Sequence, residues 1–155
     1  MSVILPGSYD PVTVGHLDII RRAAQNHETV YAVVFQNSEK EYTFSFEQRV
    51  KMLRLATEDI KNVIVDGSLG FVVDYMRNFG IEKIIKGYRN EKDVEYEMLQ
   101  AEFNKAHGGF ETELYECSPE FRNVSSTLAR ERIISNESLE GVLPKAVAEY
   151  LKGLE

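Results

Sequence analysis

The sequence predicts an α/β fold in which a five-stranded parallel sheet carries helices on both faces. Five short runs rich in β-branched and aromatic residues alternate with stretches whose apolar residues recur at helical spacing. The run 29–36 is largely apolar, as a strand buried on both faces requires. The 155 residues contain no repeat, linker or low-complexity segment, so we expect a single domain over 1–155. This pattern is Rossmann-like.

The first strand is expected at 2–5, followed by a turn rich in proline and glycine. Leu17, Ile20 and Ala24 then recur at helical spacing, so a helix begins near Val14 and His16 falls in its first turn. Free N–H groups and the positive end of the helix dipole favour an anionic ligand there. We interpret 6–16 as a phosphate turn, with an ordinary α/β connection as the alternative.

The second strand is expected at 29–36. Ser45 and Gln48 have the spacing of a capping box, which begins the second helix. A third strand at 62–66 precedes a helix whose apolar stripe ends at Gly80, a residue suited to closing a helix.

The fourth strand is expected at 82–86, ended by Gly87, and a partly exposed helix follows within 90–107. A fifth strand at 110–117 precedes a helix that Ser125 caps and that runs to about Ser135. Pro144 marks the start of the last helix. Several helical aromatic residues exceed what one core needs and favour a closed, symmetric oligomer; these are Tyr75, Phe79 and Phe103.

Composition excludes several classes of protein. A net charge of −7 without clustered Lys and Arg argues against a nucleic-acid partner. The longest strongly apolar run, 30–35, is far shorter than a membrane span, so no membrane association is expected. The single cysteine, Cys117, can form no intramolecular disulfide, and the N-terminus does not resemble a secretory signal. We expect a cytoplasmic protein.

Ligands of such sheets bind beyond the carboxyl ends of the strands, where we expect the loops 7–16, 37–42, 86–89 and 120–127 to meet. These loops hold side chains that suit a phosphate: Ser8, His16, Lys40, Lys86, Arg89, Ser125, Ser126 and Thr127. The set favours phosphoryl or nucleotidyl transfer, in which positioning and charge stabilisation supply most of the catalysis. Each residue alone has an ordinary explanation, such as a solvated charge or a helix cap.

Several other sites are excluded. The chain lacks the Gly-x-x-x-x-Gly-Lys-Ser/Thr and Gly-x-Gly-x-x-Gly patterns, which argues against a P-loop NTPase and a typical dinucleotide dehydrogenase. His16, His27 and His107 do not pair with one another or with Cys117 at ligand spacing. We therefore expect no metal held by protein ligands alone.

Three motifs carry a family resemblance. They are the turn 6–11 with Thr-Val-Gly-His at 13–16, Lys-Gly-Tyr-Arg at 86–89 followed by Asp-Val-Glu-Tyr-Glu at 93–97, and Val-Ser-Ser-Thr at 124–127. Over nearly its whole length the chain resembles the bacterial phosphopantetheine adenylyltransferases of the nucleotidyltransferase superfamily. The first motif is shared by the superfamily, whereas the second is specific to this family among its relatives.

The resemblance implies transfer of AMP from ATP to 4'-phosphopantetheine, giving dephospho-coenzyme A and pyrophosphate in coenzyme A biosynthesis. It implies Mg²⁺, held mainly by the ATP phosphates, a homohexamer, and coenzyme A as a candidate feedback ligand. By this resemblance, the catalytic residues of the chain would be His16, Lys40 and Arg89. The residues that bind 4'-phosphopantetheine would be Ser8, Lys40, Val72 and Lys86. Its ATP-binding residues would be Ser8, Tyr9, His16, Gly87, Tyr88, Arg89, Glu97, Phe121, Arg122, Asn123, Val124, Ser125, Ser126 and Thr127.

The chain departs from the family pattern at three positions. Thr13 stands where the superfamily often has a histidine, and Ser8 replaces the commoner threonine but keeps its hydroxyl. Lys86 replaces an arginine, so the charge is kept but the two-point grip on a phosphate is lost.

Two other functions stay open. One is an adenylyltransferase for nicotinate or nicotinamide mononucleotide, against which the 93–97 motif argues. The other is a non-catalytic nucleotide-binding or sensor protein, which only the Lys86 change favours. A substrate panel with ATP and a pyrophosphate assay would separate them.

Overall fold

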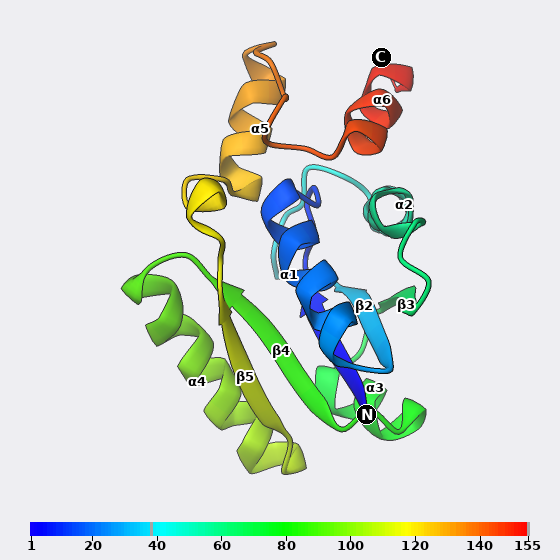
Figure 1. Cartoon of the computed structure of the whole chain (residues 1–155), viewed down its shortest axis with the longest axis vertical. Helices are drawn as coiled ribbons and strands as arrows, with labels where there is room; N and C mark the ends of the chain where they lie inside the picture. The colour runs from blue at the N-terminus through cyan, green and yellow to red at the C-terminus, as the bar shows by residue number, and fades with distance from the viewer. Residues whose placement is uncertain (38, 155) are drawn as a thin grey trace.

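The computed structural model describes residues 1–37 and 39–154 and contains one parallel sheet with the strand order β3-β2-β1-β4-β5 (Figure 1). The strands are β1 (Ser2–Gly7), β2 (Thr29–Phe35), β3 (Val63–Ser68), β4 (Lys83–Tyr88) and β5 (Glu111–Glu116). The helices are α1 (Val14–Asn26), α2 (Phe46–Thr57), α3 (Val72–Phe79), α4 (Glu91–Gly108), α5 (Ser126–Ile134) and α6 (Lys145–Gly153), with a 3-10 turn at Pro119–Phe121. The predicted Rossmann-like α/β class is confirmed.

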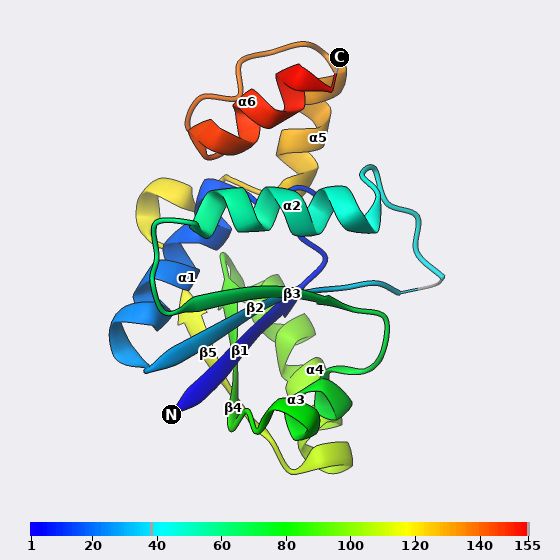
Figure 2. The same ribbon diagram turned by 90° about the vertical axis from the view of Figure 1, so that its right-hand side faces the viewer.

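Alternate residues of the central strands face opposite sides of the sheet. Val3 and Leu5 of β1 pack with α1 and α2 in a large core cluster, whereas Ile4 packs with α3 in a smaller one. Figure 2 shows α1 and α2 on one side of the sheet and α3 and α4 on the other. The sheet is therefore covered on both faces, as the apolar strand runs predicted.

The pairing of the sheet is uneven at its centre. β1 pairs with β2 along its whole length, from Ser2↔Thr29 to Gly7↔Val34. With β4 it pairs only at Val3↔Lys83 and Ile4↔Ile84. We call this short β1–β4 junction the seam, because it joins the two halves of the sheet. Beyond Ile4, the carboxyl ends of β1 and β4 are not joined by ladder pairs. The strand order reverses at the seam, and ligands of open α/β sheets bind at such a reversal.

Local signals place most helix ends where the sequence predicts them. The Ser45 hydroxyl accepts from the Gln48 N–H and the Gln48 side chain accepts from the Ser45 N–H, so the expected capping box begins α2. Gly80 has φ 66° and closes α3 in the left-handed conformation. The Ser125 hydroxyl accepts from the Leu128 N–H and caps α5.

Two expectations were wrong. Gly87 does not end β4, because it pairs with Tyr115 of β5 inside the strand. A Cβ there would lie 2.9 Å from Cγ1 of Ile19, so the glycine allows α1 to approach the sheet closely. Tyr75 is not a spare surface aromatic but a core residue, only 6% exposed, stacked on Phe79.

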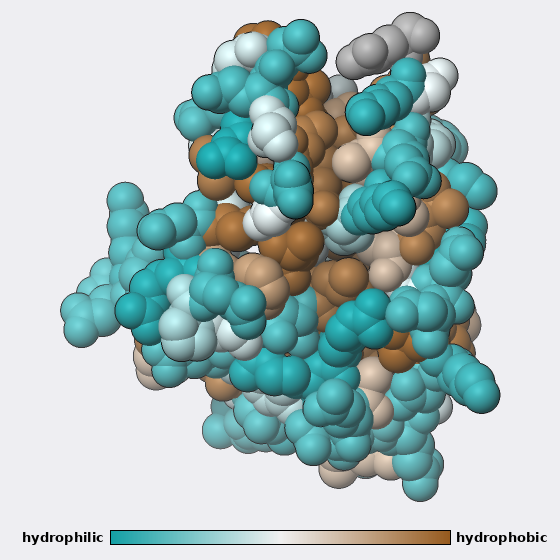
Figure 3. All heavy atoms as spheres, turned by 45° about the horizontal axis from the view of Figure 1, so that its top comes forward, coloured by the Kyte–Doolittle hydropathy of each residue, from teal (hydrophilic) through white to brown (hydrophobic). Residues whose placement is uncertain are grey.

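α5 and α6 extend the large core at the carboxyl end of the sheet. Ala129 and Val147, both 0% exposed, join that cluster from these two helices. On the face seen in Figure 3, hydrophobic residues gather between α5 and α6, with hydrophilic residues on either side. The Val14 N–H donates to the Val142 carbonyl at 2.9 Å, which ties the start of α1 to this C-terminal unit. Within the described residues, no helix is both long enough and apolar enough to span a membrane.

Candidate functional site

A pocket of about 430 Å³ opens at the seam of the sheet. All four loops that were expected to converge contribute to its lining: 7–16, 37–42, 86–89 and 120–127. Of the predicted site residues, its walls include Ser8, Tyr9, His16, Lys40, Lys86, Gly87, Tyr88, Arg89, Glu97, Phe121, Val124, Ser125, Ser126 and Thr127. The structure thus brings most of the predicted residues together, while their roles stay predictions.

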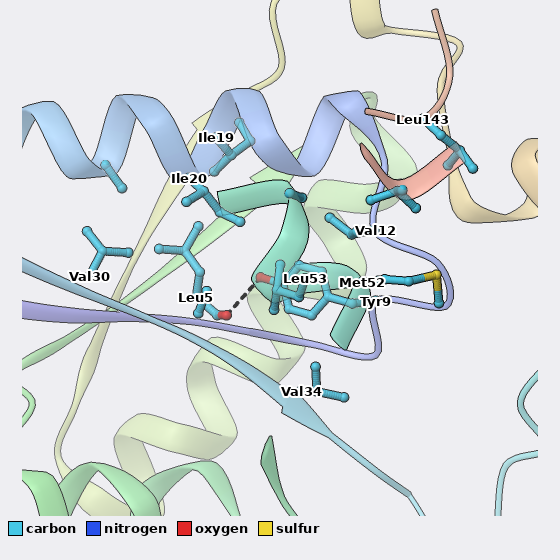
Figure 4. Close-up of a cluster of buried hydrophobic side chains, with 14 of the residues drawn as sticks. Leu5, Tyr9, Val12, Ile19, Ile20, Val30, Val34, Met52, Leu53 and Leu143 are labelled. Carbon is cyan, nitrogen blue, oxygen red and sulfur yellow. Dashed lines mark hydrogen bonds between the residues drawn. The ribbon is translucent and has the colours of Figure 1, made fainter. Parts of the chain in front are cut away.

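The turn after β1 is held in place by buried groups. Tyr9 has a φ of 49°, and its hydroxyl donates to the Leu5 carbonyl at 2.8 Å (Figure 4). The Asp10 carboxylate accepts from the N–H groups of Thr43 and Phe44, both at 2.9 Å. Since the Tyr9 ring lies in the core, a ligand would meet this residue through its backbone. An unusual backbone conformation held by buried contacts is typical of a functional turn.

His16 is fixed in one tautomer by Thr13. The Thr13 N–H donates to the His16 Nδ1 at 3.0 Å, and the Thr13 hydroxyl accepts from the His16 N–H at 3.3 Å. A backbone N–H can only donate, so Nδ1 carries no proton and the neutral ring is protonated at Nε2. Burial, together with the nearby charges of Lys86 and Arg89, lowers the pKa of His16 from 6.5 to about 4. His16 is therefore a neutral donor at neutral pH.

Titration of His16 tests this assignment. Since its pKa is lowered from 6.5 to about 4, the ring should stay neutral between about pH 8 and 5. The unfolded chain takes up this proton at a higher pH than the folded chain, so the folded state loses stability as pH falls from 6.5 towards 4. Nitrogen NMR should show the proton on Nε2, with His16→Gln assigning the signal. A ring that titrates near its ordinary pKa would contradict the burial of His16, and a proton on Nδ1 would contradict the Thr13 hydrogen bond.

Two cations at the end of β4 face carboxylates of α4. The Lys86 Nζ donates to the Pro6 carbonyl at 3.1 Å and lies 3.6 Å from the Glu97 Oε2. The Arg89 Nε donates to the Asp93 Oδ2 at 3.2 Å, and the Arg89 N–H binds the same oxygen. Burial raises the pKa of Glu97, and Lys86 opposes that shift. Lys86 thus bridges the two strands across the seam.

The loop from β2 to α2 and the start of α5 supply the remaining polar groups. Lys40 is exposed, with its Nζ 5.5 Å from the centre of the Tyr42 ring. On α5, the Ser126 hydroxyl donates to the Pro11 carbonyl at 2.8 Å, joining this helix to the turn after β1. The N-termini of α1 and α5 therefore both lie at the pocket, where free N–H groups favour an anion.

Sequence reasoning missed Arg130, which lines the pocket from α5. Its Nη1 donates to the Asp10 carbonyl at 2.8 Å and its Nη2 to the Thr127 hydroxyl at 3.2 Å. The signal was present, because residues three apart on a helix share a face and Arg130 follows Thr127 by three. Asp93 and Tyr96 also line the pocket and were not assigned as site residues.

Three predicted site residues do not line the pocket. Val72 begins α3 and packs against the smaller core cluster on the opposite face of the sheet. Arg122 and Asn123 are exposed in the turn that follows the 3-10 segment. Their assigned roles rest on the family resemblance alone and stay predictions.

The pocket is built for an anionic ligand that needs several donors. Four cationic side chains line it, those of Lys40, Lys86, Arg89 and Arg130, with the neutral imidazole of His16 among them. Within residues 1–37 and 39–154, no group of three or more His, Cys, Asp or Glu side chains is arranged to hold a metal ion. Fixed donors around developing phosphate charge are the main requirement for nucleotidyl transfer.

Comparison with known proteins agrees with this geometry. The family described as cytidylyltransferase-like matches residues 4–132. The chain is 39% identical over 150 residues to a phosphopantetheine adenylyltransferase of Bdellovibrio bacteriovorus, covering 96% of this chain and 94% of the relative. It is 39% identical over 153 residues to one of Symbiobacterium thermophilum, covering 98% of this chain and 94% of the relative.

Proposed function

The chain belongs to the phosphopantetheine adenylyltransferases within the cytidylyltransferase-like family, and we propose that its pocket transfers the adenylyl group of ATP to 4'-phosphopantetheine. The products would be dephospho-coenzyme A and pyrophosphate, which places the enzyme in coenzyme A biosynthesis. The observation that carries the proposal is the convergence of four donor-bearing loops on one pocket at the seam of the sheet.

The reaction is a displacement at the α-phosphorus of ATP. A phosphate oxygen of 4'-phosphopantetheine attacks this atom in line, the bond to the bridging oxygen of the β-phosphate breaks, and pyrophosphate leaves with the electron pair. The Nε2–H of His16 donates to an α-phosphate oxygen, and Lys40 and Arg89 offset the charge of the transition state. No covalent enzyme intermediate is needed, in keeping with catalysis by positioning and charge stabilisation.

The two substrates would take different walls of the pocket. ATP would lie against the N-termini of α1 and α5 and the segment 87–89, where backbone N–H groups and hydroxyls are concentrated. The phosphate of 4'-phosphopantetheine would lie near Ser8, Lys40 and Lys86. In this arrangement His16, in the first turn of α1, would face the phosphates of ATP.

Magnesium would enter with the nucleotide. The carboxylates near the pocket are engaged: Asp10 accepts two backbone N–H groups, Asp93 pairs with Arg89, and Glu97 faces Lys86. These residues fit a Mg²⁺ ion only as outer partners of an ion held by phosphate oxygens, a common arrangement for this metal. The ion would supply further neutralisation of phosphate charge.

The experiment that tests the function is a pyrophosphate assay on the purified chain. Mixing ATP, Mg²⁺ and 4'-phosphopantetheine should release pyrophosphate and form dephospho-coenzyme A. Nicotinate mononucleotide and nicotinamide mononucleotide in place of 4'-phosphopantetheine serve as controls and should give no release. Nucleotide binding without release from any of the three acceptors would point to a sensor protein instead.

We also propose a homohexamer, and the surface of α4 supports assembly. None of the 18 residues of α4 is buried, and large apolar side chains lie open on it. Tyr96 at 60% exposed, Leu99 at 66% and Phe103 at 49% share one face by their spacing, and Met98 at 53% lies on another side of the helix. An open apolar helix face of this kind is typical of an interaction surface.

A charge on this face should break the assembly. Leu99→Glu and Phe103→Glu should each lower the molar mass measured by light scattering at micromolar concentration, because a carboxylate is costly to bury at an interface. Both positions lie outside the pocket lining. The control is Lys152→Glu, a charge change on α6. A wild-type chain that is monomeric under these conditions would refute the proposal.

We also propose a cellular location and a feedback ligand for this protein. A cytoplasmic location is supported by the single cysteine, Cys117, which is buried and free. Coenzyme A shares the phosphopantetheine and adenosine chemistry of the two proposed ligands, so it is a candidate feedback ligand for the same pocket. Competition of coenzyme A with ATP in a binding titration would measure it.

A further inference from the structure

Arg49 of α2 is buried where a charge is costly. It is 0% exposed, yet it takes part in none of the ion pairs found in the part of the chain that the structure describes. A buried guanidinium is tolerated only when its N–H groups find acceptors. The acceptors of Arg49 therefore indicate why it is there.

Those acceptors belong to three separate segments. The Arg49 Nη1 donates to the Ser8 carbonyl at 3.1 Å, in the turn after β1. The Nε donates to the Phe44 carbonyl at 3.2 Å, just before α2, and the Nη2 donates to the side-chain oxygen of Gln36, just after β2. One side chain thus joins the turn after β1 to both ends of the loop that carries Lys40.

Tyr42 connects this guanidinium to the loop itself. The central carbon of the Arg49 guanidinium lies 3.9 Å from the centre of the Tyr42 ring, close enough for a cation–π stack. The Tyr42 hydroxyl accepts from the Asn37 N–H at 2.8 Å, and the Lys40 N–H donates to the Asn37 carbonyl at 3.1 Å. The same ring has the Lys40 Nζ 5.5 Å from its centre.

Asp10 fixes the far end of the same loop through the N–H groups of Thr43 and Phe44. Lys40 therefore extends from a segment whose two ends are both tied to the turn after β1. Neither Arg49 nor Tyr42 lines the pocket, whereas Ser8 and Lys40 do. Any effect of the Arg49–Tyr42 pair on a ligand must act through these neighbours.

We propose that the Arg49–Tyr42 pair positions Lys40 for the phosphate of 4'-phosphopantetheine. It does so by clamping the loop 39–44 against the turn that carries Ser8. This inference rests on the proposed function, because it takes Lys40 to meet that phosphate. Arg49 and Tyr42 are positioning residues, since neither touches the ligand. The pair should matter for 4'-phosphopantetheine and little for ATP.

The test is a double-mutant cycle between Tyr42→Leu and Lys40→Met. The measured quantities are the Kd for 4'-phosphopantetheine by calorimetry and kcat/KM by pyrophosphate release. Tyr42→Leu should weaken binding roughly 10-fold in the wild-type background and less than about twofold in the Lys40→Met background, as expected for two residues that act as a unit. ATP binding should stay within about twofold in all variants. Equal effects in both backgrounds would overturn the proposal.

Two conservative variants and one control sharpen the cycle. Tyr42→Phe keeps the ring and should retain binding within about threefold, whereas Arg49→Lys loses the planar fork and should behave like Tyr42→Leu. A Tyr42→Phe loss as large as that of Tyr42→Leu would overturn the role of the ring. Arg54→Lys, on the exposed side of the same helix, should behave as wild type. If the wild-type protein binds 4'-phosphopantetheine but releases no pyrophosphate, the proposed function is refuted. The double-mutant cycle on the Kd for 4'-phosphopantetheine would still decide this inference.

Discussion

His16→Ala should lower kcat about 10²- to 10⁴-fold, with a much smaller change in the Kd for ATP. The reason is geometric, since His16 stands at the N-terminus of α1 with Nδ1 occupied by Thr13, so the proton of the neutral ring is on Nε2 and can be donated to a ligand in the pocket. A donor to charge that develops only in the transition state affects kcat more than ground-state binding. Steady-state kinetics and an ATP titration on the same preparation measure both quantities.

Two variants make the His16 result specific. His16→Gln keeps an amide donor near the position of Nε2 and should recover part of the lost rate. His27→Ala removes a histidine from the other end of α1, where its ring contacts the Ala23 carbonyl, and should leave kcat within about twofold. If His16→Ala lowered the melting temperature but kept its kcat, the residue would serve the turn's structure alone.

Lys86→Met should lower kcat/KM for 4'-phosphopantetheine about 10- to 150-fold, equivalent to the roughly 1.5–3 kcal/mol of a charge-assisted hydrogen bond. Lys86 lies at the seam, anchored to the Pro6 carbonyl and 3.6 Å from the Glu97 carboxylate. Lys86→Arg should keep activity and lower KM for 4'-phosphopantetheine, because a guanidinium grips a phosphate with two parallel donors. Equal activity of all three proteins would show that Lys86 does not bind the substrate.

Glu97 supplies the control for this series. Removing Lys86 leaves a mostly buried carboxylate without its counterion, and that alone can disturb the pocket. The double variant Lys86→Met with Glu97→Gln removes both charges. If Lys86 binds the substrate phosphate, calorimetry should find the double variant as weak for 4'-phosphopantetheine as Lys86→Met. Recovery of binding in the double variant would assign the loss to the unpaired Glu97.

Features with a local cause could be predicted from the sequence. The caps at Ser45 and Ser125 and the left-handed Gly80 depend on neighbours within four residues, so their sequence signals were sufficient. The convergence of the four loops followed from a general property of parallel sheets rather than from any residue in particular. The fold and the position of the pocket could therefore be predicted from the sequence.

Features that depend on residues far apart in the sequence could not be predicted. Gly87 does not end β4. Its lack of a side chain instead leaves room for Ile19, which is far away in the sequence. A charged helix residue such as Arg49 is expected at the surface. It is instead fully buried, and its hydrogen-bond acceptors come from three separate segments. Arg130 finds its partner Asp10 from the other end of the chain. Helical and strand periodicity carry no information about such contacts.

The short seam between β1 and β4 gives ligands a mechanical role. The two halves of the sheet share two ladder positions, at Val3 and Ile4, and beyond them the Lys86 bond to the Pro6 carbonyl spans the gap. A phosphate bound by Ser8 and Lys40 on one side and by Lys86 and Arg89 on the other would link the two halves of the sheet across that gap. Part of its binding free energy would then resist separation of the two halves, so an occupied pocket would make the sheet stiffer as well as more stable.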